Sequence, residues 1–273
     1  MRSRIGNRAV VACAIGLGAA FGACAQEAPG GDEALAKQLS NPVSSLISVP
    51  FQYNADFGFE PEDGVQHKLN IQPVVPTSIN DNWNLITRVI VPVIYQDDVI
   101  GRESQFGLGD ITPSFFFSPK QPTAGGWTLG IGPAFLLPSA TDDLLGGEQW
   151  AAGPTMIALR QTQGGWTYGV LMNHLWSFAG NDDRDDISAT FLQPFVAKQF
   201  PGARTLTVNF ESSYDWEHEQ WTVPLNLTYS KVIRVGQQRL SLVGGVRGYL
   251  DAPENGPDWG IRLGVTFLFP EHH

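Results

Sequence analysis

The sequence predicts an all-β protein, a transmembrane antiparallel β-barrel of about 12 strands with a short N-terminal periplasmic helix. Three observations lead to this fold class. The chain begins with a segment laid out like a secretory signal peptide. It then alternates apolar and polar residues over strand-length segments. It also holds no later run of the ~20 apolar residues that a membrane-spanning helix needs.

The predicted leader occupies residues 1–25. It has an apolar run over residues 9–23, too short to span a bilayer, and a small-residue cleavage site ending at Ala25. A lipoprotein with Cys24 lipidated is the weaker alternative, because Phe21 is a poor first residue for that motif. The positive charges of the leader are Arg2, Arg4 and Arg8.

Charge and cysteine content narrow the function classes. Both cysteines, Cys13 and Cys24, lie in the leader, so the mature chain is expected to have neither a disulfide nor a thiol ligand. The formal net charge is −10, and removal of the three leader arginines makes it −13. Such an acidic chain is a poor candidate for binding nucleic acid.

A short periplasmic segment, residues 26–43, is expected between the leader and the barrel. Asp32 can cap a helix over residues 32–39, and the Asn41-Pro42 pair would end it. This helix is predicted either in the periplasm or in the barrel mouth, and the sequence leaves open whether it plugs the lumen. The barrel is predicted over residues 44–269, with a tail at residues 270–273.

Strand alternation is clearest in the C-terminal half. Over residues 206–216, Leu206 and Val208 share one face, and Asn209 and Glu211 share the other. A soluble antiparallel sheet or a β-propeller would also alternate in this way, so the periodicity alone does not identify a membrane protein. The predicted strands are residues 44–59, 66–77, 83–95, 106–118, 127–138, 149–161, 166–178, 188–199, 205–216, 220–233, 239–250 and 258–269.

The predicted connections alternate in length and chemistry. Those after even-numbered strands are mostly short, such as residues 80–82 and 201–203, although residues 118–126 make a longer exception. Those after odd-numbered strands are mostly longer and acidic, as in residues 181–186. Short periplasmic turns and longer outer loops are typical of outer-membrane barrels.

Aromatic and charged residues support a membrane barrel. Pairs such as Trp83 with Tyr95, or Trp166 with Trp176, lie about one strand length apart and fit two interfacial girdles. Charged residues fall in mid-strand on the polar faces, where a packed soluble core would not tolerate them unpaired. The pore-lining candidates are Lys68, Arg88, Glu211, Asp215, Arg239, Arg247 and Arg262.

The last predicted strand carries a pattern typical of the outer-membrane assembly signal. A polar residue, a glycine and two outward aromatic residues stand at Arg262, Gly264, Phe267 and Phe269. The barrel assembly machinery is therefore an expected partner. Four residues follow Phe269, whereas the signal usually ends the chain.

Several stretches of the mature chain carry a family resemblance: residues 41–52, 70–76, the Phe106-Gly-Leu-Gly-Asp110 motif, and residues 132–142, 176–180 and 214–224. In them the chain resembles a family of outer-membrane proteins named for the meta-pathway of phenol degradation, often labelled "transporter" or neuromedin U. The resemblance covers nearly the whole mature chain. It implies an outer-membrane barrel, but the family's transport role is loosely defined and supplies no substrate residues.

The function expected from these features is passive passage of small solutes through a monomeric barrel in the outer membrane of a Gram-negative bacterium. Anionic or aromatic compounds are favoured because positive side chains outnumber acidic ones among the candidates. The alternative is a closed structural or adhesion barrel, whose acidic loops meet partners or lipopolysaccharide. In both cases the barrel contacts outer-membrane lipid.

Three groups of residues resemble enzymatic or ligand sites but lack the pattern that such sites need. His174 could activate a serine, yet Ser177 lies three residues along and falls on the opposite strand face. The acidic run 182–186 lacks the glycine and distal glutamate of a calcium loop, and the glycines of residues 106–110 enter a strand rather than a helix. We therefore expect no enzyme, no metal site and no cofactor.

Overall fold

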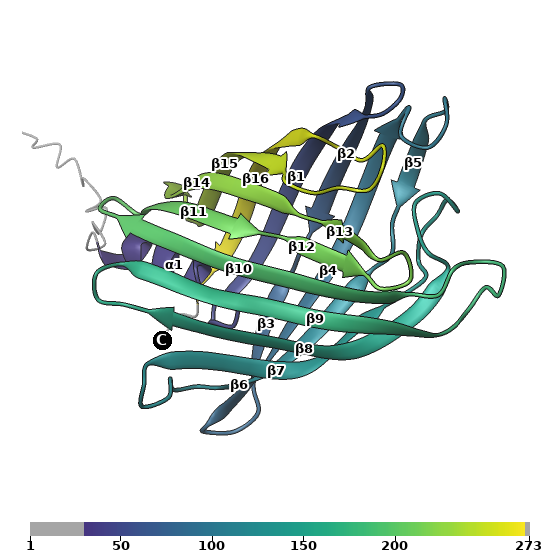
Figure 1. The fold of residues 1–273 in the computed structure, drawn as a ribbon. Helices are drawn as coiled ribbons and strands as arrows, with labels where there is room; N and C mark the ends of the chain where they lie inside the picture. Colours follow the sequence, from purple (N-terminus) through teal and green to yellow (C-terminus); the bar gives the residue numbers. More distant parts are fainter. Residues whose placement is uncertain (1–29, 271–273) are drawn as a thin grey trace, which may run out of the picture.

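The computed structural model describes residues 30–270, which form one closed antiparallel β-barrel with a short helix at one end (Figure 1). This confirms the predicted fold class. The elements are α1 Gly30–Leu39, β1 Ile47–Phe59, β2 Gly64–Ile71, β3 Val74–Ser78, β4 Trp83–Asp97, β5 Gln105–Leu108, β6 Thr112–Pro119, β7 Trp127–Leu136, β8 Gln149–Gln161, β9 Trp166–Gly180, β10 Ser188–Phe200, β11 Arg204–Phe210, β12 Ser212–Asp215, β13 Gln220–Thr222, β14 Pro224–Val235, β15 Gln238–Tyr249 and β16 Trp259–Phe269.

These 16 segments make twelve crossings, because β2/β3, β5/β6, β11/β12 and β13/β14 are each one interrupted strand. Between β5 and β6 the interruption is a bulge: Leu108 pairs with Val93 but Thr112 with Ile90, so one extra residue is accommodated. The first strand pairs with the last, and β10 pairs with β11. The ring therefore has no free sheet edge among residues 30–270.

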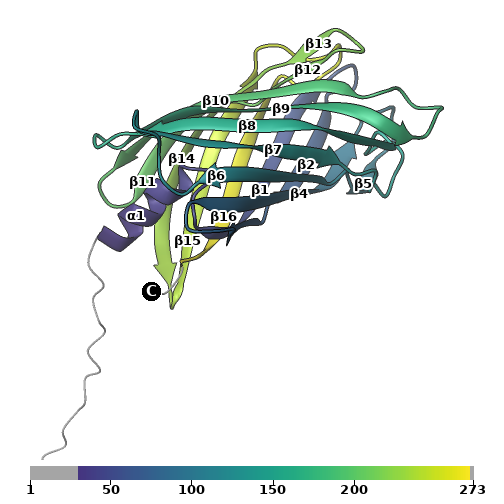
Figure 2. The same ribbon diagram turned by 90° about the horizontal axis from the view of Figure 1, so that it is seen from below.

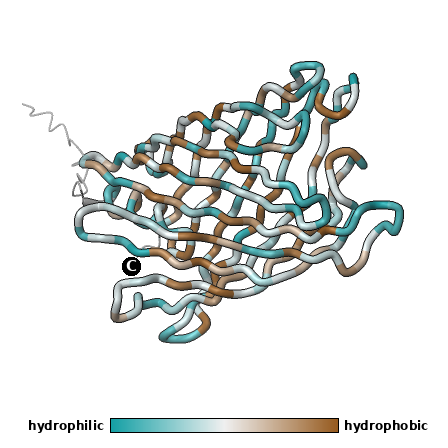
Figure 3. The backbone as a smooth tube through the Cα atoms, in the orientation of Figure 1, coloured by the Kyte–Doolittle hydropathy of each residue, from teal (hydrophilic) through white to brown (hydrophobic). Residues whose placement is uncertain are grey.

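The two ends of the barrel differ as the sequence predicts. The turn end, at the left of Figure 1, holds the links 79–82, 120–126, 162–165, 201–203 and 236–237 together with α1. The loop end, at the right, holds the links 60–63, 98–104, 137–148, 181–187, 216–219 and 250–258. More than half of the 27 Asp and Glu residues lie in the loop-end links, and teal segments are frequent at this end in the hydropathy view (Figure 3).

The outer face of the barrel suits a lipid environment. Large apolar side chains that would be buried in a soluble protein are exposed here, among them Leu227, Leu242, Val246 and Leu263. Exposed aromatic residues lie towards both ends of the strands: Tyr95, Trp150, Trp176, Trp216 and Trp259 at the loop end, and Trp83, Trp127, Trp166, Phe200 and Phe269 at the turn end. No helix within residues 30–270 is long and apolar enough to cross a membrane.

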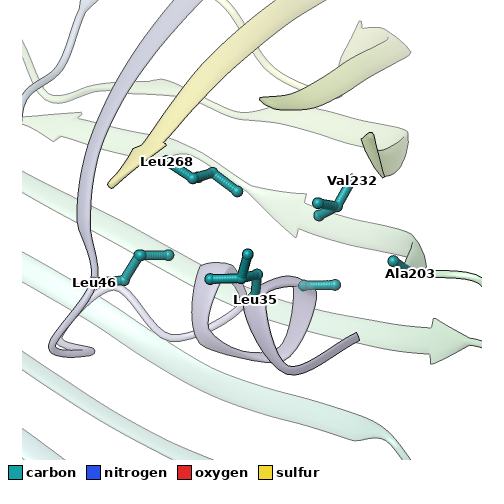
Figure 4. Close-up of a cluster of buried hydrophobic side chains, with 6 residues drawn as sticks. Leu35, Leu46, Ala203, Val232 and Leu268 are labelled. Atoms are coloured by element: carbon teal, nitrogen blue, oxygen red, sulfur yellow. The ribbon is translucent and has the colours of Figure 1, made fainter. Parts of the chain in front are cut away.

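Helix α1 lies inside the mouth of the barrel at the turn end (Figure 2). Leu35 and Ala36 pack against the inward-facing Val232 and Leu268, with Leu46 and Ala203 beside them (Figure 4). Polar contacts fix the helix to several strands: Gln161 donates to the Lys37 carbonyl at 2.8 Å, Gln199 donates to the Glu33 carbonyl at 2.6 Å, and Arg239 pairs with Asp32 at 3.0 Å. Of the two locations expected for this helix, the mouth is therefore the one observed. The predicted leader lies outside the described residues.

The interior of the barrel is divided into two chemically different sides. The apolar wall consists of Val43, Ile86, Phe116, Ile157, Leu159 and Leu171, a cluster in which Val43 comes from the segment before β1 and the others from β4, β6, β8 and β9. These side chains meet inside the ring and are almost fully buried. The polar wall comprises the inward-facing polar residues of β1, β2, β11, β14, β15 and β16, together with Arg88 on β4 and Glu211 directly after β11, and any aqueous path must follow it.

Candidate functional site

Three neighbouring cavities follow the polar wall from the loop end to the turn end. The outer cavity, of about 880 Å³, is lined by loop residues such as Ile100 and Pro253 and by Lys68. The middle cavity, of about 300 Å³, shares Glu211 and Arg262 with the outer one. The inner cavity, of about 290 Å³, adjoins α1 and shares Gln72, Gln193 and Asn209 with the middle one. The polar wall thus offers space along most of the barrel.

A buried ion pair separates the outer and middle cavities. The Arg262 guanidinium on β16 donates from both terminal nitrogens to the two carboxylate oxygens of Glu211, at 2.8 and 2.7 Å. Its Nε donates to Asn54 Oδ1 at 2.7 Å. Since β14 and β15 lie between β11 and β16, this bidentate pair crosses part of the lumen rather than joining neighbouring strands. It narrows the path at this level.

A second arginine extends the network towards the loop end. Arg247 Nη1 lies 3.4 Å from Asp56 Oδ2, and Nη2 lies 3.9 Å from Glu211 Oε2. Its guanidinium also lies over the Tyr249 ring, 5.1 Å from the centroid. Gly260 is the register partner of both Asp56 and Arg247, and a Cβ at this position would collide with the Asp56 carboxylate. The glycine therefore makes room for the charges to meet.

Two further cations line the cavities without a carboxylate partner. Lys68, in the outer cavity, makes no hydrogen bond or salt bridge within residues 30–270, although Asp56 and Glu211 act on it electrostatically. Arg88, in the middle cavity, donates to Gln72 Oε1 at 2.7 Å and forms no salt bridge within residues 30–270, although Glu211 acts on it electrostatically as well. One such cation therefore lies on each side of the Glu211–Arg262 pair.

The structure brings together five of the seven predicted pore-lining residues and separates two. Lys68, Arg88, Glu211, Arg247 and Arg262 line the outer and middle cavities. By contrast, neither Arg239 nor Asp215 lines any of the three cavities.

Those two residues lie near opposite ends of the barrel. Arg239 holds α1 through Asp32 at the turn end. Asp215 accepts hydrogen bonds from the backbone of Glu217 and His218 at the loop end. Both side chains are thus engaged in holding local structure.

Sequence reasoning missed Asp56 and Asn54, which complete the network. Both are almost fully buried, at 4 % and 2 % exposure. The available signal was the period-2 set Gln52, Asn54 and Asp56 on β1, whose three side chains line the outer cavity. Their amides and carboxylate supply the hydrogen-bond and charge partners that the two arginines need.

The loop 137–148 occupies part of the lumen at the loop end. The Asp110 carboxylate accepts hydrogen bonds from the backbone of Ser139, Ala140 and Gly147 at 3.1, 3.1 and 2.7 Å. A Cβ at Gly107 would collide with the Thr141 hydroxyl. The Phe106–Asp110 motif thus acts as an anchor for this loop, a role that the sequence did not reveal.

The last strand combines two roles that share one segment. Phe267 and Phe269 belong to the outward face of β16, whereas Gly264 and Arg262 face inward, opposite Gln52 and Asn54 of β1. Arg262, which the sequence suggested as part of an assembly signal, therefore also holds the ion pair in the lumen.

The residues that resemble an enzymatic site have local partners. His174 Nδ1 lies 2.7 Å from the Thr190 hydroxyl on the outer face, and its ring lies 4.0 Å from that of Trp176. Ser177 instead donates to Asp186 at 2.9 Å. Within residues 30–270, no group of three or more His, Cys, Asp or Glu side chains could hold a metal ion.

Comparison with known families identifies the chain. A model of the family described as MetA-pathway of phenol degradation matches residues 50–273. The chain belongs to this family. Its description names a pathway and assigns no solute or reaction to this chain. The sequence has no significant match among curated proteins.

Solved structures show the same fold. The COG4313 outer membrane channel from Pseudomonas putida F1 is similar with a TM-score of 0.66 at 13 % identity, over 82 % of this chain and 96 % of that one. The NanC porin is similar with a TM-score of 0.51 at 10 % identity, over 81 % of this chain and 98 % of that one. At such identities the likeness concerns the outer-membrane barrel fold alone.

Proposed function

We propose that this protein is a passive channel for small polar solutes in the outer membrane of a Gram-negative bacterium, with a preference for anions. The observation that supports it is the series of three cavities along the polar wall, with Lys68 and Arg88 on either side of the Glu211–Arg262 pair, where neither forms a salt bridge within residues 30–270. A permeating anion would pass from one cation to the other. The loop end would face the outside and the turn end the periplasm.

The charge balance around this pair supports anions. Four cations, Lys68, Arg88, Arg247 and Arg262, stand against two carboxylates, Asp56 and Glu211, which leaves a formal charge of +2. The acidic loops oppose this preference at the mouth. Their charges are exposed, however, and salt screens exposed charges beyond about 8 Å at physiological ionic strength. The narrow, partly buried level therefore dominates selectivity.

A closed structural or adhesion barrel is the second candidate, and one observation favours it. Two inserts enter the lumen from opposite ends, α1 at the turn end and the loop 137–148 at the loop end, with the Glu211–Arg262 pair between them. If these three obstacles leave no continuous water path, the acidic loops would be the functional surface, facing lipopolysaccharide. Conductance distinguishes the two candidates.

The test is the reversal potential of the purified barrel in a planar bilayer under a KCl gradient. The wild-type channel is expected to favour chloride, and Lys68→Glu combined with Arg88→Glu is expected to shift the permeability ratio several-fold towards potassium. The interaction energy between an ion and a unit charge about 4 Å away is about 1 kcal/mol in bulk water and about 4 kcal/mol at a partly buried site. Added salt weakens this interaction. Lys68→Arg with Arg88→Lys should keep the wild-type ratio.

Two outcomes would contradict the proposal. A folded barrel, recognised by heat-modifiable migration, that carries no current supports the closed barrel instead. A channel whose ion preference ignores both charge reversals would mean that ions do not pass Lys68 and Arg88. Arg160→Glu, a charge reversal at an exposed position outside the three cavities, is the matched control and should leave the reversal potential unchanged.

A further inference from the structure

Two basic side chains lie directly opposite each other on the outer face at the turn end. Arg204 on β11 and Lys231 on β14 are register partners, and both are exposed. They share the outward face with Leu206 and Tyr229, whose side chains are 38 % and 47 % exposed. Like charges at opposed positions of neighbouring strands repel each other and weaken the pairing. An anion bound between the two side chains would offset this repulsion.

Within residues 30–270, no carboxylate supplies that offset. Arg204 Nε donates to the Pro201 carbonyl at 2.8 Å, which carries no net charge, and Lys231 forms no salt bridge. The acids of α1 are engaged inside the mouth, where Glu33 accepts from the Gly202 amide at 2.9 Å and Asp32 pairs with Arg239. The two cations therefore face the surroundings of the barrel with their charge uncompensated.

The neighbours of the pair place it at a lipid interface. Phe200 on β10 is the other register partner of Arg204 and is 40 % exposed. Lys198, two residues earlier on the same outward face, holds its ammonium 4.9 Å from the centroid of the Trp166 ring. Aromatic residues flanked by basic side chains are typical of the level where acyl chains meet headgroups. The pair is thus positioned at headgroup depth.

We propose that Arg204 and Lys231 bind the phosphate of an anionic phospholipid in the leaflet at the turn end. The guanidinium can donate two parallel hydrogen bonds to one phosphate, and the ammonium adds a point charge from the adjacent strand. The Phe200 side chain lies beside the pair, where it can contact the glycerol backbone or the start of an acyl chain. The bound lipid would hold β11 against β14 at their common end.

The experiment compares two lipids that share their acyl chains, one with an anionic headgroup and one with a zwitterionic headgroup. The full-length barrel, folded in neutral detergent, receives phosphatidylglycerol or phosphatidylcholine with identical acyl chains, and the midpoint of heat-modifiable unfolding is measured. Phosphatidylglycerol is expected to raise the midpoint by about 2–4 °C more than phosphatidylcholine, the size expected from one modest stabilising interaction in a chain of this length. Equal shifts with both lipids would overturn the proposal.

Lys231→Glu keeps the test independent of folding. This change replaces the repulsive pair with an attractive one opposite Arg204, so the barrel should fold while losing the shift specific to phosphatidylglycerol. Lys120→Glu is the matched control, because Lys120 lies in the turn between β6 and β7, where it donates to Ser78 at 2.7 Å, and it should keep the shift. A full shift in Lys231→Glu would refute the site. The same shift from glycerol 3-phosphate would assign the site to free phosphate and refute the lipid.

Discussion

The two walls of the lumen solve the same packing problem in opposite ways. The apolar wall is filled by side chains such as Phe116 and Leu159, which need no partner and leave no space for water. The polar wall is held by a few charged side chains that each need a specific partner, and three cavities remain beside them. The apolar wall therefore contributes stability without selectivity. The polar wall can contribute selectivity, but only while its charged side chains keep their specific partners.

The difference explains where Val43 and the loop 137–148 lie. The segment after α1 contributes Val43 to the apolar wall, and the loop is seated against β4, β5 and β6 through Asp110 and Gly107. The polar wall receives neither the loop nor Val43, although α1 caps it at the turn end. Val43 and the loop thus fill the apolar side, whereas α1 packs on Val232 and Leu268 at the turn end of the charged side, which stays open between the two inserts.

The largest effect is expected at the polar wall, from Arg262→Ala. Removal of this guanidinium leaves the Glu211 carboxylate without its bidentate partner and Asn54 without its donor. Breaking one partner of a buried ion pair costs roughly 3–5 kcal/mol, so the free energy of unfolding should fall by about that amount. The measurement is denaturant unfolding of the barrel in lipid, followed by tryptophan fluorescence.

The double variant Arg262→Ala/Glu211→Ala sharpens this result. With both charges gone, no uncompensated carboxylate remains, and a large part of the lost stability should return. The passage between the outer and middle cavities should also widen and conduct more. If the double variant is as unstable as the sum of the two single ones, Arg262 acts through something other than Glu211.

A slightly smaller effect is expected at the apolar wall, from Leu159→Ala. Leu159 is completely buried, and truncation of such a residue costs about 2–5 kcal/mol through lost contacts and the cavity left behind. Single-channel conductance and ion preference should not change, because this wall lines no aqueous path. A rise in conductance would break the distinction between the two walls.

Leu242→Ala is the matched control on the outer face. Leu242 is 44 % exposed to the surroundings, so lipid can fill the space that the truncation creates. The stability loss should be well below that of Leu159→Ala in the same lipid. Equal losses of stability in the two variants would indicate that a side chain inside the ring contributes no more to stability than one on the outer face.

The smallest effect is expected outside both walls, at His218 in the link between β12 and β13. Its Nδ1 lies 2.9 Å from Asp215 Oδ2 and its Nε2 lies 3.6 Å from Asp185 Oδ2. The hydrogen bond and charge of Asp215 raise the pKa of His218 above its ordinary value. The contact between the two loops is therefore fully present below the unfolded pKa and is lost as pH rises through the raised one.

An NMR titration of His218 checks this effect. The pKa should fall towards its ordinary value in Asp215→Asn, while barrel unfolding should hardly depend on pH near neutrality because the contact is exposed. An unchanged pKa in that variant would show that Asp215 is not its cause.

The sequence predicts which face a residue occupies, but it does not predict depth. Alternation places Glu211 and Asp215 on one strand face, and only Glu211 lines a cavity, because Asp215 lies four residues further towards the loop end. Arg239 and Arg262 also both face inward, but Arg239 lies at the turn end beside α1, whereas Arg262 lies between the outer and middle cavities. A period-2 pattern predicts the face of a residue, but it does not predict where along the strand the lumen is narrow.

Contacts between segments that are distant in the sequence are the second feature that the sequence does not predict. Nothing local in Phe106–Asp110 reveals that its carboxylate holds residues 139–147, about thirty residues further along. Nor does the sequence around Val43 show that this residue packs against the inward side chains of β4, β6, β8 and β9. By contrast, strand positions and the acidic loop end were predictable, because turn chemistry and alternation are local properties.

The position of Arg262 on the last strand also orders events during barrel formation. Its partners are Asn54 on β1 and Glu211 directly after β11, and β1 is also the strand that β16 must join to close the ring. Until that closure, the Glu211 carboxylate lacks its bidentate partner and has only the longer contact with Arg247 at 3.9 Å. Closure of the ring and completion of this ion pair are therefore one event, so a barrel that lacks its final strand keeps both an open edge and an incompletely paired carboxylate inside.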